Sequence, residues 1–144
     1  AYEIPKRDWS SDVCSSDLLC GPIQIESALT ILEQTAALAA EHRFEETVAN
    51  SLVVQEPVGV AAAITPWNYP LFQTIAKVAA ALAAGCTVVH KPSGLAPLSS
   101  FILADAFAAA GLPAGVYNLV TGPGSTVGEA LAGHPGVRIV SFTG

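Results

Sequence analysis

The sequence Thr-Pro-Trp-Asn-Tyr-Pro at residues 65–70 carries the strongest chemical signal, because it directly follows an apolar run at residues 58–64. A buried strand that ends in a proline-bracketed turn before a helical pattern places the turn at the carboxyl end of a parallel sheet, where open α/β folds bind ligands. The Asn68 amide can donate two hydrogen bonds to an oxygen that gains negative charge, as an oxyanion hole requires. The alternative interpretation is a turn residue between two prolines.

A second polar position, Lys91, follows the next apolar run at residues 87–90. An ammonium at the mouth of a strand could donate to ribose hydroxyls or face a phosphate. The alternative is a solvated surface lysine, which is the more common environment for this residue type.

Glycines provide a third signal at Gly122, Gly124 and Gly128. Their spacing is one residue longer than the usual dinucleotide fingerprint, and no acidic residue lies about 20 residues downstream, so a standard motif is not present. Gly124 and Ser125 still precede a helical pattern whose free amides would attract a pyrophosphate. A tight turn without a ligand fits these residues equally well.

The cysteines and histidines show no metal-binding pattern. Cys14, Cys20 and Cys86 have no metal-ligand spacing and cannot all pair with one another, which suits a reducing compartment. Cys86 is interpreted as a small buried hydrophobic residue, since no base near it in sequence would activate a thiolate. His90 alternates with Val89 in a strand pattern and is interpreted as a structural histidine.

Elements that would position these residues alternate between apolar runs and helical patterns. This alternation predicts an α/β fold with a doubly wound parallel sheet. Gly85 is expected to end its helix as a left-handed cap. An amphipathic helix is expected at residues 23–42, a polar connection at 44–50 and a short strand at 51–55. The remaining predicted strands are 58–64, 87–90, 116–120 and 137–142, and the remaining helices are 71–84, 98–110 and 125–132.

Composition excludes several classes of protein. The 144 residues are 51% hydrophobic and 12% charged, with a net charge of −6. The absence of a Lys/Arg cluster argues against a nucleic-acid partner, and no apolar stretch reaches the length of a membrane span. The sequence shows no signal-peptide pattern at its start, so a cytoplasmic location is expected.

Residues 8–18 follow neither helical nor strand periodicity and contain a repeated Ser-Ser-Asp. They match one reading frame of a common sequencing adapter, so they are interpreted as an artefact within a flanking segment at residues 1–18. An ordinary polar loop is the alternative. The organisation then expected is a helix and connection at 19–50 and a partial cofactor-binding domain at 51–144.

Five ordered motifs resemble the aldehyde dehydrogenase superfamily over about residues 51–144. The resemblance implies a Rossmann-like cofactor domain, NAD or NADP as cofactor, and oxidation of a small-molecule aldehyde to a carboxylic acid through a cysteine thiohemiacetal and thioester. It also implies a homo-oligomeric full-length protein. The motifs are Glu-Pro-Val-Gly-Val at 56–60, Thr-Pro-Trp-Asn-Tyr-Pro at 65–70, Gly-Cys-Thr-Val-Val-His-Lys-Pro-Ser at 85–93, Ala-Gly-Leu-Pro-Ala-Gly-Val at 110–116 and Ser-Phe-Thr-Gly at 141–144.

By this resemblance, Asn68 would be the catalytic oxyanion donor, Lys91 would bond the adenosine ribose, and Gly144 would begin the segment that receives the pyrophosphate. Gly124 and Ser125 would lie along the nucleotide. The full set of implied cofactor-binding residues is Thr65, Pro66, Trp67, Asn68, Lys91, Ser93, Gly94, Gly124, Ser125 and Gly144.

Two departures from the family pattern affect these expectations. Gly94 stands where a glutamate commonly grips the ribose hydroxyls, which leaves room for a 2′-phosphate and allows NADP use. The family's catalytic cysteine and glutamate would follow Gly144, so the sequence is expected to be an amino-terminal fragment that is inactive by itself. A non-catalytic nucleotide-binding or scaffolding module and a relative that acylates coenzyme A are the alternatives.

Overall fold

The computed structural model describes residues 20–144, so the flanking segment and the suspected artefact at 8–18 lie outside the described residues. A four-stranded parallel sheet forms the centre, in the order β5-β4-β3-β6. The first strand of this sheet is β3. The next two strands, β4 and β5, are added on one side of β3, and β6 then pairs with its other side. The predicted doubly wound fold is therefore confirmed. The strands are β3 (Val60–Ile64), β4 (Thr87–Lys91), β5 (Tyr117–Leu119) and β6 (Val137–Phe142).

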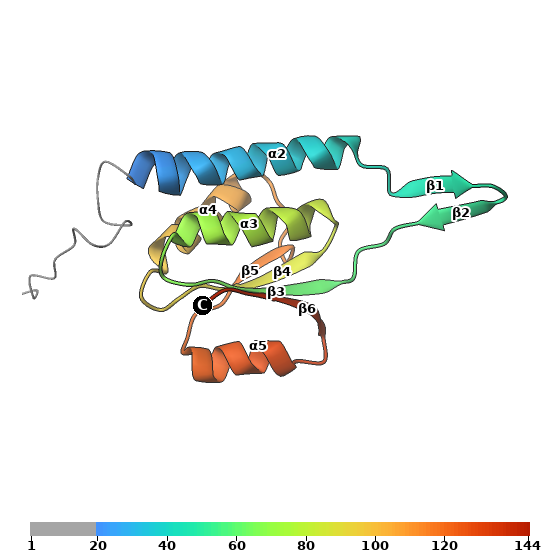
Figure 1. The fold of residues 1–144 in the computed structure, drawn as a ribbon. Helices are drawn as coiled ribbons and strands as arrows, with labels where there is room; N and C mark the ends of the chain where they lie inside the picture. Colours follow the sequence, from blue (N-terminus) through green and yellow to red (C-terminus); the bar gives the residue numbers. More distant parts are fainter. Residues whose placement is uncertain (1–19) are drawn as a thin grey trace, which may run out of the picture.

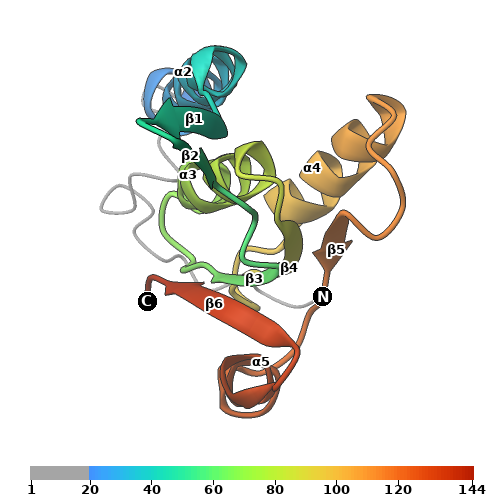
Figure 2. The same ribbon diagram turned by 90° about the vertical axis from the view of Figure 1, so that its right-hand side faces the viewer.

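Helices cover both faces of the sheet. Figures 1 and 2 show α3 (Pro70–Ala83) and α4 (Leu98–Ala109) on one face and α5 (Glu129–Gly133) on the other. The short π-helical turn η3 (Gly124–Gly128) leads into α5. Gly85 follows α3 with φ of 79°, which confirms the predicted left-handed cap.

Two clusters of buried apolar residues within residues 20–144 share α3. Ala63 of β3, Val78 of α3 and Val88 of β4 form the cluster on the sheet, and Val78 and Val88 are fully buried. The second cluster joins α3 to its neighbouring helices through Ala28, Ile75, Ala79 and Leu103. Burial of this apolar surface stabilises the position of α3. The start of α3 therefore fixes one end of the turn at residues 65–69.

The predicted helix at residues 23–42 is present with a modified start. A π-helical segment, η2 (Cys20–Glu26), leads into α2 (Ser27–Glu41), which packs along α3. Ala28 is buried on the inner side, but Ile25 and Leu29 remain exposed. The apolar stripe that predicted this helix is thus only partly covered by the described chain.

A hairpin corrects one prediction. The connection expected at residues 44–50 contains a strand, β1 (Glu45–Val48), which pairs antiparallel with β2 (Ser51–Val54). Both strands are exposed throughout and extend away from the sheet (Figure 1). Backbone pairing stabilises the hairpin where no buried face exists, and hydrophobic periodicity could not reveal it. Ala49, at φ of 53°, supplies the left-handed turn. The division of the chain into a helix with connection at 19–50 and a cofactor-binding domain at 51–144 stays a prediction.

Candidate functional site

Loops leaving all four parallel strands enclose one crevice of about 580 Å³ at the carboxyl edge of the sheet. The crevice lies where the strand order reverses between β3 and β6, the place where doubly wound folds bind ligands. Strand register brings the loops together, because Ile64 pairs with Lys91 on one side and with Phe142 on the other. The lining residues are Ile64, Thr65, Pro66, Trp67, Asn68, Lys91, Ser93, Gly94, Gly122, Pro123, Gly124, Phe142, Thr143 and Gly144.

The turn after β3 is fixed at both ends. The Thr65 N–H donates to the Lys91 carbonyl at 3.1 Å, which joins the ends of β3 and β4. Tyr69 adopts a left-handed conformation at φ 52° and ψ 48°, and Pro70 then begins α3. A non-glycine residue in this region is uncommon and is held by its surroundings. Trp67 and Asn68 are exposed on the crevice between these fixed points.

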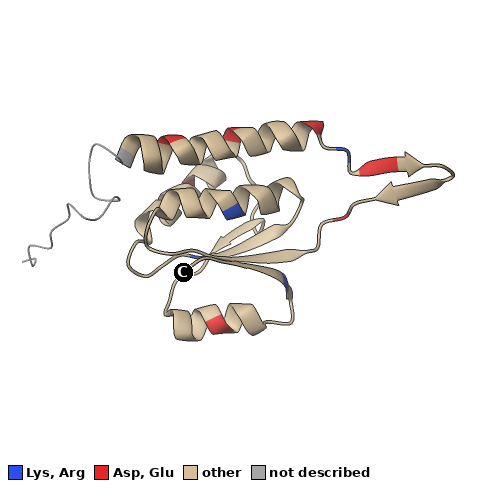
Figure 3. Ribbon diagram, in the orientation of Figure 1, with Lys and Arg blue, Asp and Glu red and all other residues tan. Residues whose placement is uncertain are grey.

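Lys91 is buried, with 4% of its surface exposed, so the alternative of a solvated surface lysine is wrong. Its Nζ donates to the Pro92 carbonyl at 3.0 Å. An ammonium carries three donors. Within residues 20–144 no carboxylate forms an ion pair with it, and no Asp or Glu lines the crevice. Figure 3 shows the acidic residues on other elements, such as α2, β1 and α5. The crevice therefore has a local positive charge within an acidic chain.

His90 lies behind the crevice wall and is fully buried. Its Nε2 lies 3.0 Å from Thr65 Oγ1 and 3.4 Å from Thr74 Oγ1, and its Nδ1 lies 2.7 Å from the Tyr117 hydroxyl. Burial, with a smaller contribution from the charge of Lys91, lowers the pKa of His90 to about 4. Burial also raises the pKa of Tyr117. The imidazole and the phenol are both uncharged near neutral pH, which fits the interpretation of His90 as a structural histidine.

The glycine-rich segment contributes Gly122 and Gly124 to the crevice, whereas Ser125 is exposed and does not line it. Gly122 has φ of 147°, and a Cβ there would lie 2.5 Å from Val127 Cγ2. Only glycine fits this backbone without a shift. The G-x-G spacing identified the segment, but not which of its glycines the fold requires.

Ser93 and Gly94 continue the loop after β4. The Leu95 N–H donates to Ser93 Oγ at 3.3 Å, which shapes the loop as a turn. Gly94 is exposed, and a Cβ built on it would meet no atom within 4 Å. The site thus has open space at the position where the family commonly carries a glutamate.

Sequence reasoning did not assign several lining residues: Ile64, Gly122, Pro123, Phe142 and Thr143. The Thr143 N–H donates to the Ile64 carbonyl at 3.1 Å, so the end of β6 is tied to the end of β3. These residues share one property that was available from the sequence. Each lies at, or just after, the carboxyl end of a predicted strand.

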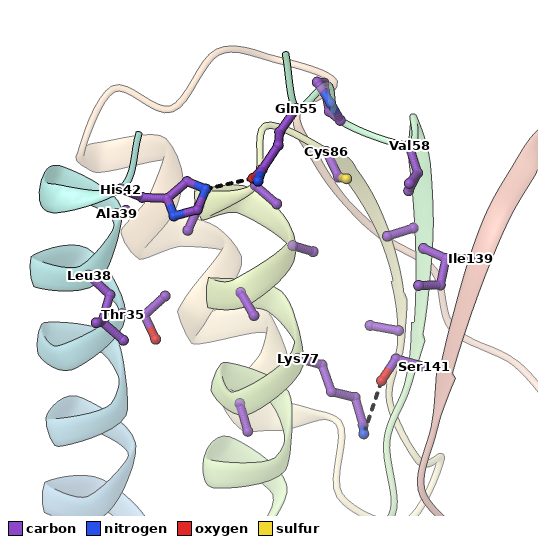
Figure 4. A pocket seen from close by; sticks show the side chains of 18 of the residues that line it. Thr35, Leu38, Ala39, His42, Gln55, Val58, Lys77, Cys86, Ile139 and Ser141 are labelled. Carbon is purple, nitrogen blue, oxygen red and sulfur yellow. Dashed lines mark hydrogen bonds between the residues drawn. The ribbon is translucent and has the colours of Figure 1, made fainter. Parts of the chain in front are cut away.

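A second cavity of about 610 Å³ lies between α2, α3 and the sheet (Figure 4). Two hydrogen bonds frame it: His42 Nε2 with Gln55 Oε1 at 2.8 Å, and Lys77 Nζ to Ser141 Oγ at 3.3 Å. Cys86, a buried free cysteine, is one of the residues that line this cavity. This agrees with the interpretation of Cys86 as a small hydrophobic residue. None of the predicted site residues lines this cavity.

Among residues 20–144, no three His, Cys, Asp or Glu side chains gather in a way that could hold a metal ion. In the same part of the chain, no helix has the length and apolar character needed to cross a membrane.

A doubly wound parallel sheet with a cationic crevice at its switch point defines the class of α/β domains that bind nucleotides and related anions. Within that class, the family model "Aldehyde dehydrogenase family" matches residues 18–144. The chain belongs to the aldehyde dehydrogenase family, as its five motifs indicated.

Among curated relatives, 3-succinoylsemialdehyde-pyridine dehydrogenase from a Pseudomonas species is 51% identical over 123 residues. The match covers 85% of this chain and 26% of the relative, so the chain spans about a quarter of the length of that protein.

Solved structures show the same fold. Aldehyde dehydrogenase C of Pseudomonas syringae, a mutant in complex with NAD+ and octanal, is 47% identical with a TM-score of 0.80, and the match covers 82% of this chain and 24% of that one. Betaine aldehyde dehydrogenase of Staphylococcus aureus in complex with NAD+ is 39% identical with a TM-score of 0.77, covering 81% and 24%.

Proposed function

We propose that the full-length protein containing this chain oxidises an aldehyde to a carboxylic acid with NAD or NADP, and that the crevice at the ends of β3, β4, β5 and β6 holds the cofactor. The buried Lys91 ammonium in a crevice without acidic side chains is the observation that carries this proposal. Membership of the aldehyde dehydrogenase family supports it. So does the presence of NAD+ in the similar structures.

The chemistry of the crevice fits such a cofactor. One Lys91 donor is used by the Pro92 carbonyl, which leaves two donors for ribose hydroxyls or phosphate oxygens. Pro66 and the exposed Trp67 offer apolar surface beside these polar groups. Gly124 and Gly144 let a ligand approach the backbone, since neither carries a side chain. A bound nicotinamide would supply the hydride acceptor that aldehyde oxidation requires.

Asn68 is proposed to act on the substrate oxygen. In the family mechanism, a cysteine thiolate adds to the aldehyde carbon, and the carbonyl oxygen becomes an alkoxide. The exposed Asn68 amide at the crevice would donate a hydrogen bond to that oxygen. Removing one such donor typically costs about 2.7–4 kcal/mol of transition-state stabilisation. When bound, the nicotinamide would accept hydride from the carbon of this thiohemiacetal, which leaves a thioester. A glutamate-activated water would then hydrolyse the thioester, releasing the acid and the cysteine thiolate.

The cysteine nucleophile is proposed to lie outside the described residues. Cys86 is 6% exposed, lines the other cavity and has no histidine or carboxylate hydrogen-bonded to it within residues 20–144. A buried thiol in apolar surroundings is a poor nucleophile. None of Cys14, Cys20 and Cys86 stands at the place of the family's catalytic cysteine, so residues 1–144 alone are expected not to turn over aldehyde.

Gly94 is proposed to permit NADP. A carboxylate at this position would repel a 2′-phosphate, whereas Gly94 places neither charge nor side-chain volume there. The Lys91 ammonium, at the end of β4 just before this loop, adds favourable charge. We accordingly expect activity with NADP+ as well as with NAD+.

The full-length protein is also proposed to be a homo-oligomer. Leu52, Val53 and Val54 are exposed on a hairpin that stands away from the sheet, and apolar surface of this kind supports a protein contact. Sedimentation of the full-length protein would test this, and a monomer at all concentrations would contradict it. A cytoplasmic location stays a prediction.

The test of the function is oxidation of a panel of aldehydes by the purified full-length protein, followed by the absorbance of the reduced nicotinamide. Turnover with NAD+ or NADP+ and release of free acid is the expected result. Turnover only with coenzyme A would show an acylating enzyme. Cofactor binding without turnover would show a non-catalytic module, and no binding would overturn the proposal as a whole.

A further inference from the structure

We propose that His90 is a positioning residue of the crevice, which orients Thr65 through a chain of hydrogen bonds running from Tyr117 to His90 to Thr65. The inference rests on the proposed function, because it assigns His90 a part in cofactor affinity. His90 itself lines no part of the crevice. It would act through the threonine that does.

The geometry around His90 joins three elements at one buried point. Thr65 follows β3, Thr74 belongs to α3, and Tyr117 begins β5, and each places a hydroxyl within 3.4 Å of an imidazole nitrogen. Val88 lies two residues earlier on the same face of β4, where it belongs to the apolar cluster with Ala63 and Val78. An apolar side chain at position 90 would satisfy packing alone, so the polar imidazole indicates a role in hydrogen bonding.

The hydroxyl groups determine which atoms donate and which accept along this series of hydrogen bonds. Within residues 20–144, the Tyr117 hydroxyl has one hydrogen-bond partner, His90 Nδ1 at 2.7 Å. This half-buried phenol has no other acceptor among the described residues, so we assign Nδ1 as the accepting nitrogen. In a neutral imidazole the other nitrogen then carries the hydrogen. Nε2–H accordingly donates to Thr65 Oγ1 at 3.0 Å, in preference to Thr74 Oγ1 at 3.4 Å.

Donation from His90 to Thr65 leaves the Thr65 hydroxyl hydrogen available at the crevice wall. The Thr65 hydroxyl accepts from His90 and keeps its own hydrogen, which makes it a potential donor to an oxygen in the crevice. Thr65 also donates its backbone N–H to the Lys91 carbonyl at 3.1 Å. Fixing Thr65 thus fixes the first residue of the turn that carries Asn68 and its junction with the Lys91 loop.

The experiment is a double-mutant cycle in the full-length enzyme, with the Kd of NADH and NADPH measured by fluorescence of the reduced nicotinamide. The variants are Thr65→Val, His90→Leu and both together. Loss of one hydrogen bond corresponds to roughly a fivefold weaker Kd for each single variant. If His90 acts through Thr65, the double variant is also roughly fivefold weaker, since the second change removes nothing further.

Val88→Ala is the matched control. Val88 is fully buried on the same face of β4, so its truncation lowers the melting temperature and leaves the Kd of NADH unchanged. An unchanged Kd in His90→Leu, or a double variant whose loss is the product of the two single losses, overturns the inference. A Kd in Val88→Ala that weakens as much as in His90→Leu also overturns it, because a general loss of packing would then suffice.

Nitrogen-15 NMR of labelled histidine in the wild-type enzyme tests the direction without any dependence on how the leucine variant folds. His90→Gln identifies the His90 signals by their loss. A neutral ring with its hydrogen on Nε2 is the expected result, and a hydrogen on Nδ1 or a charged imidazolium at neutral pH overturns the assignment.

The two proposals fail differently in these measurements. A wild-type enzyme that binds neither NADH nor NADPH overturns the proposed function, and the role of His90 falls with it. A wild-type enzyme that binds cofactor while His90→Leu binds it equally well overturns the role of His90 alone.

Discussion

Asn68 and Lys91 open onto the same crevice, although Asn68 follows β3 and Lys91 is the last residue of β4. Parallel pairing places Ile64 opposite Lys91, and the hydrogen bond from Thr65 N–H to the Lys91 carbonyl extends that pairing by one residue. An amide donor and a buried ammonium are thereby held on one rim of a sheet. This relationship is what the proposed cofactor site depends on.

Asn68→Ala is expected to lower kcat of the full-length enzyme by about 10²–10³, because the developing alkoxide loses a hydrogen-bond donor. The Kd of the cofactor should change little. Asn118→Ala is the control: that amide bonds the Val88 and Gly115 carbonyls away from the crevice, so it should affect stability and not kcat. Equal turnover by Asn68→Ala and wild type would remove Asn68 from the mechanism.

Lys91→Met is expected to weaken NADH and NADPH binding by roughly 10- to 100-fold, as loss of a charged hydrogen bond implies. Methionine keeps most of the buried volume and removes the charge. Lys77→Met provides the comparison, because Lys77 bonds Ser141 in the other cavity. Isothermal titration calorimetry should separate the two variants, and similar affinities in both would contradict the assignment of Lys91.

Gly94→Glu is expected to shift cofactor preference toward NAD+, since the new carboxylate would accept from the ribose hydroxyls and repel a 2′-phosphate. A Cβ added at Gly94 would meet no atom within 4 Å. The measurement is the ratio of kcat/KM for NAD+ and NADP+. A wild-type enzyme that already uses NAD+ alone would show that an open Gly94 does not admit NADP.

Gly122→Ala is expected to destabilise the protein by about 1–3 kcal/mol, because φ of 147° is strained for any residue with a Cβ. The added carbon would also lie 2.5 Å from Val127 Cγ2. Gly124→Ala, where no atom lies within 4 Å of the added carbon, should be close to wild type in stability. Thermal melting compares the two, and equal losses would show that the Gly122 conformation is not required.

Acid is expected to destabilise the protein through His90. Its pKa is about 4 when folded and near 6.5 when unfolded, so the unfolded chain binds more protons between these values, and stability falls as pH drops through that window. The full loss below pH 4 is about 3 kcal/mol. Tyr117 and Lys91 are the titratable groups that face or adjoin the ring. Burial raises the pKa of Tyr117, so its phenol stays uncharged in this range.

His90→Gln isolates that effect. An amide can supply one donor and one acceptor without titrating, so the melting temperature of this variant should depend less on pH between 6.5 and 4. Identical pH profiles for the variant and wild type would mean that His90 does not charge on unfolding.

The alternating strands and helices could be predicted from the sequence because each is indicated by residues within or next to it. Gly85 marked the end of α3, and the apolar run at β6 had its observed bounds. Burial of Lys91 could not be predicted, since it follows from the pairing of β4 between β3 and β5. The same holds for His90, whose three hydroxyl partners lie far from it in sequence. Strand β1 was missed because its exposed Glu45 and Glu46 carry no hydrophobic pattern.

Difference density for NAD+ in crystals of the full-length protein is the most direct measurement of where the cofactor binds. The account predicts density in the crevice, with the adenosine ribose within hydrogen-bond distance of Lys91 Nζ and the nicotinamide toward Asn68. Density in the cavity around Lys77 and Cys86, or in neither place at saturating NAD+, would contradict it.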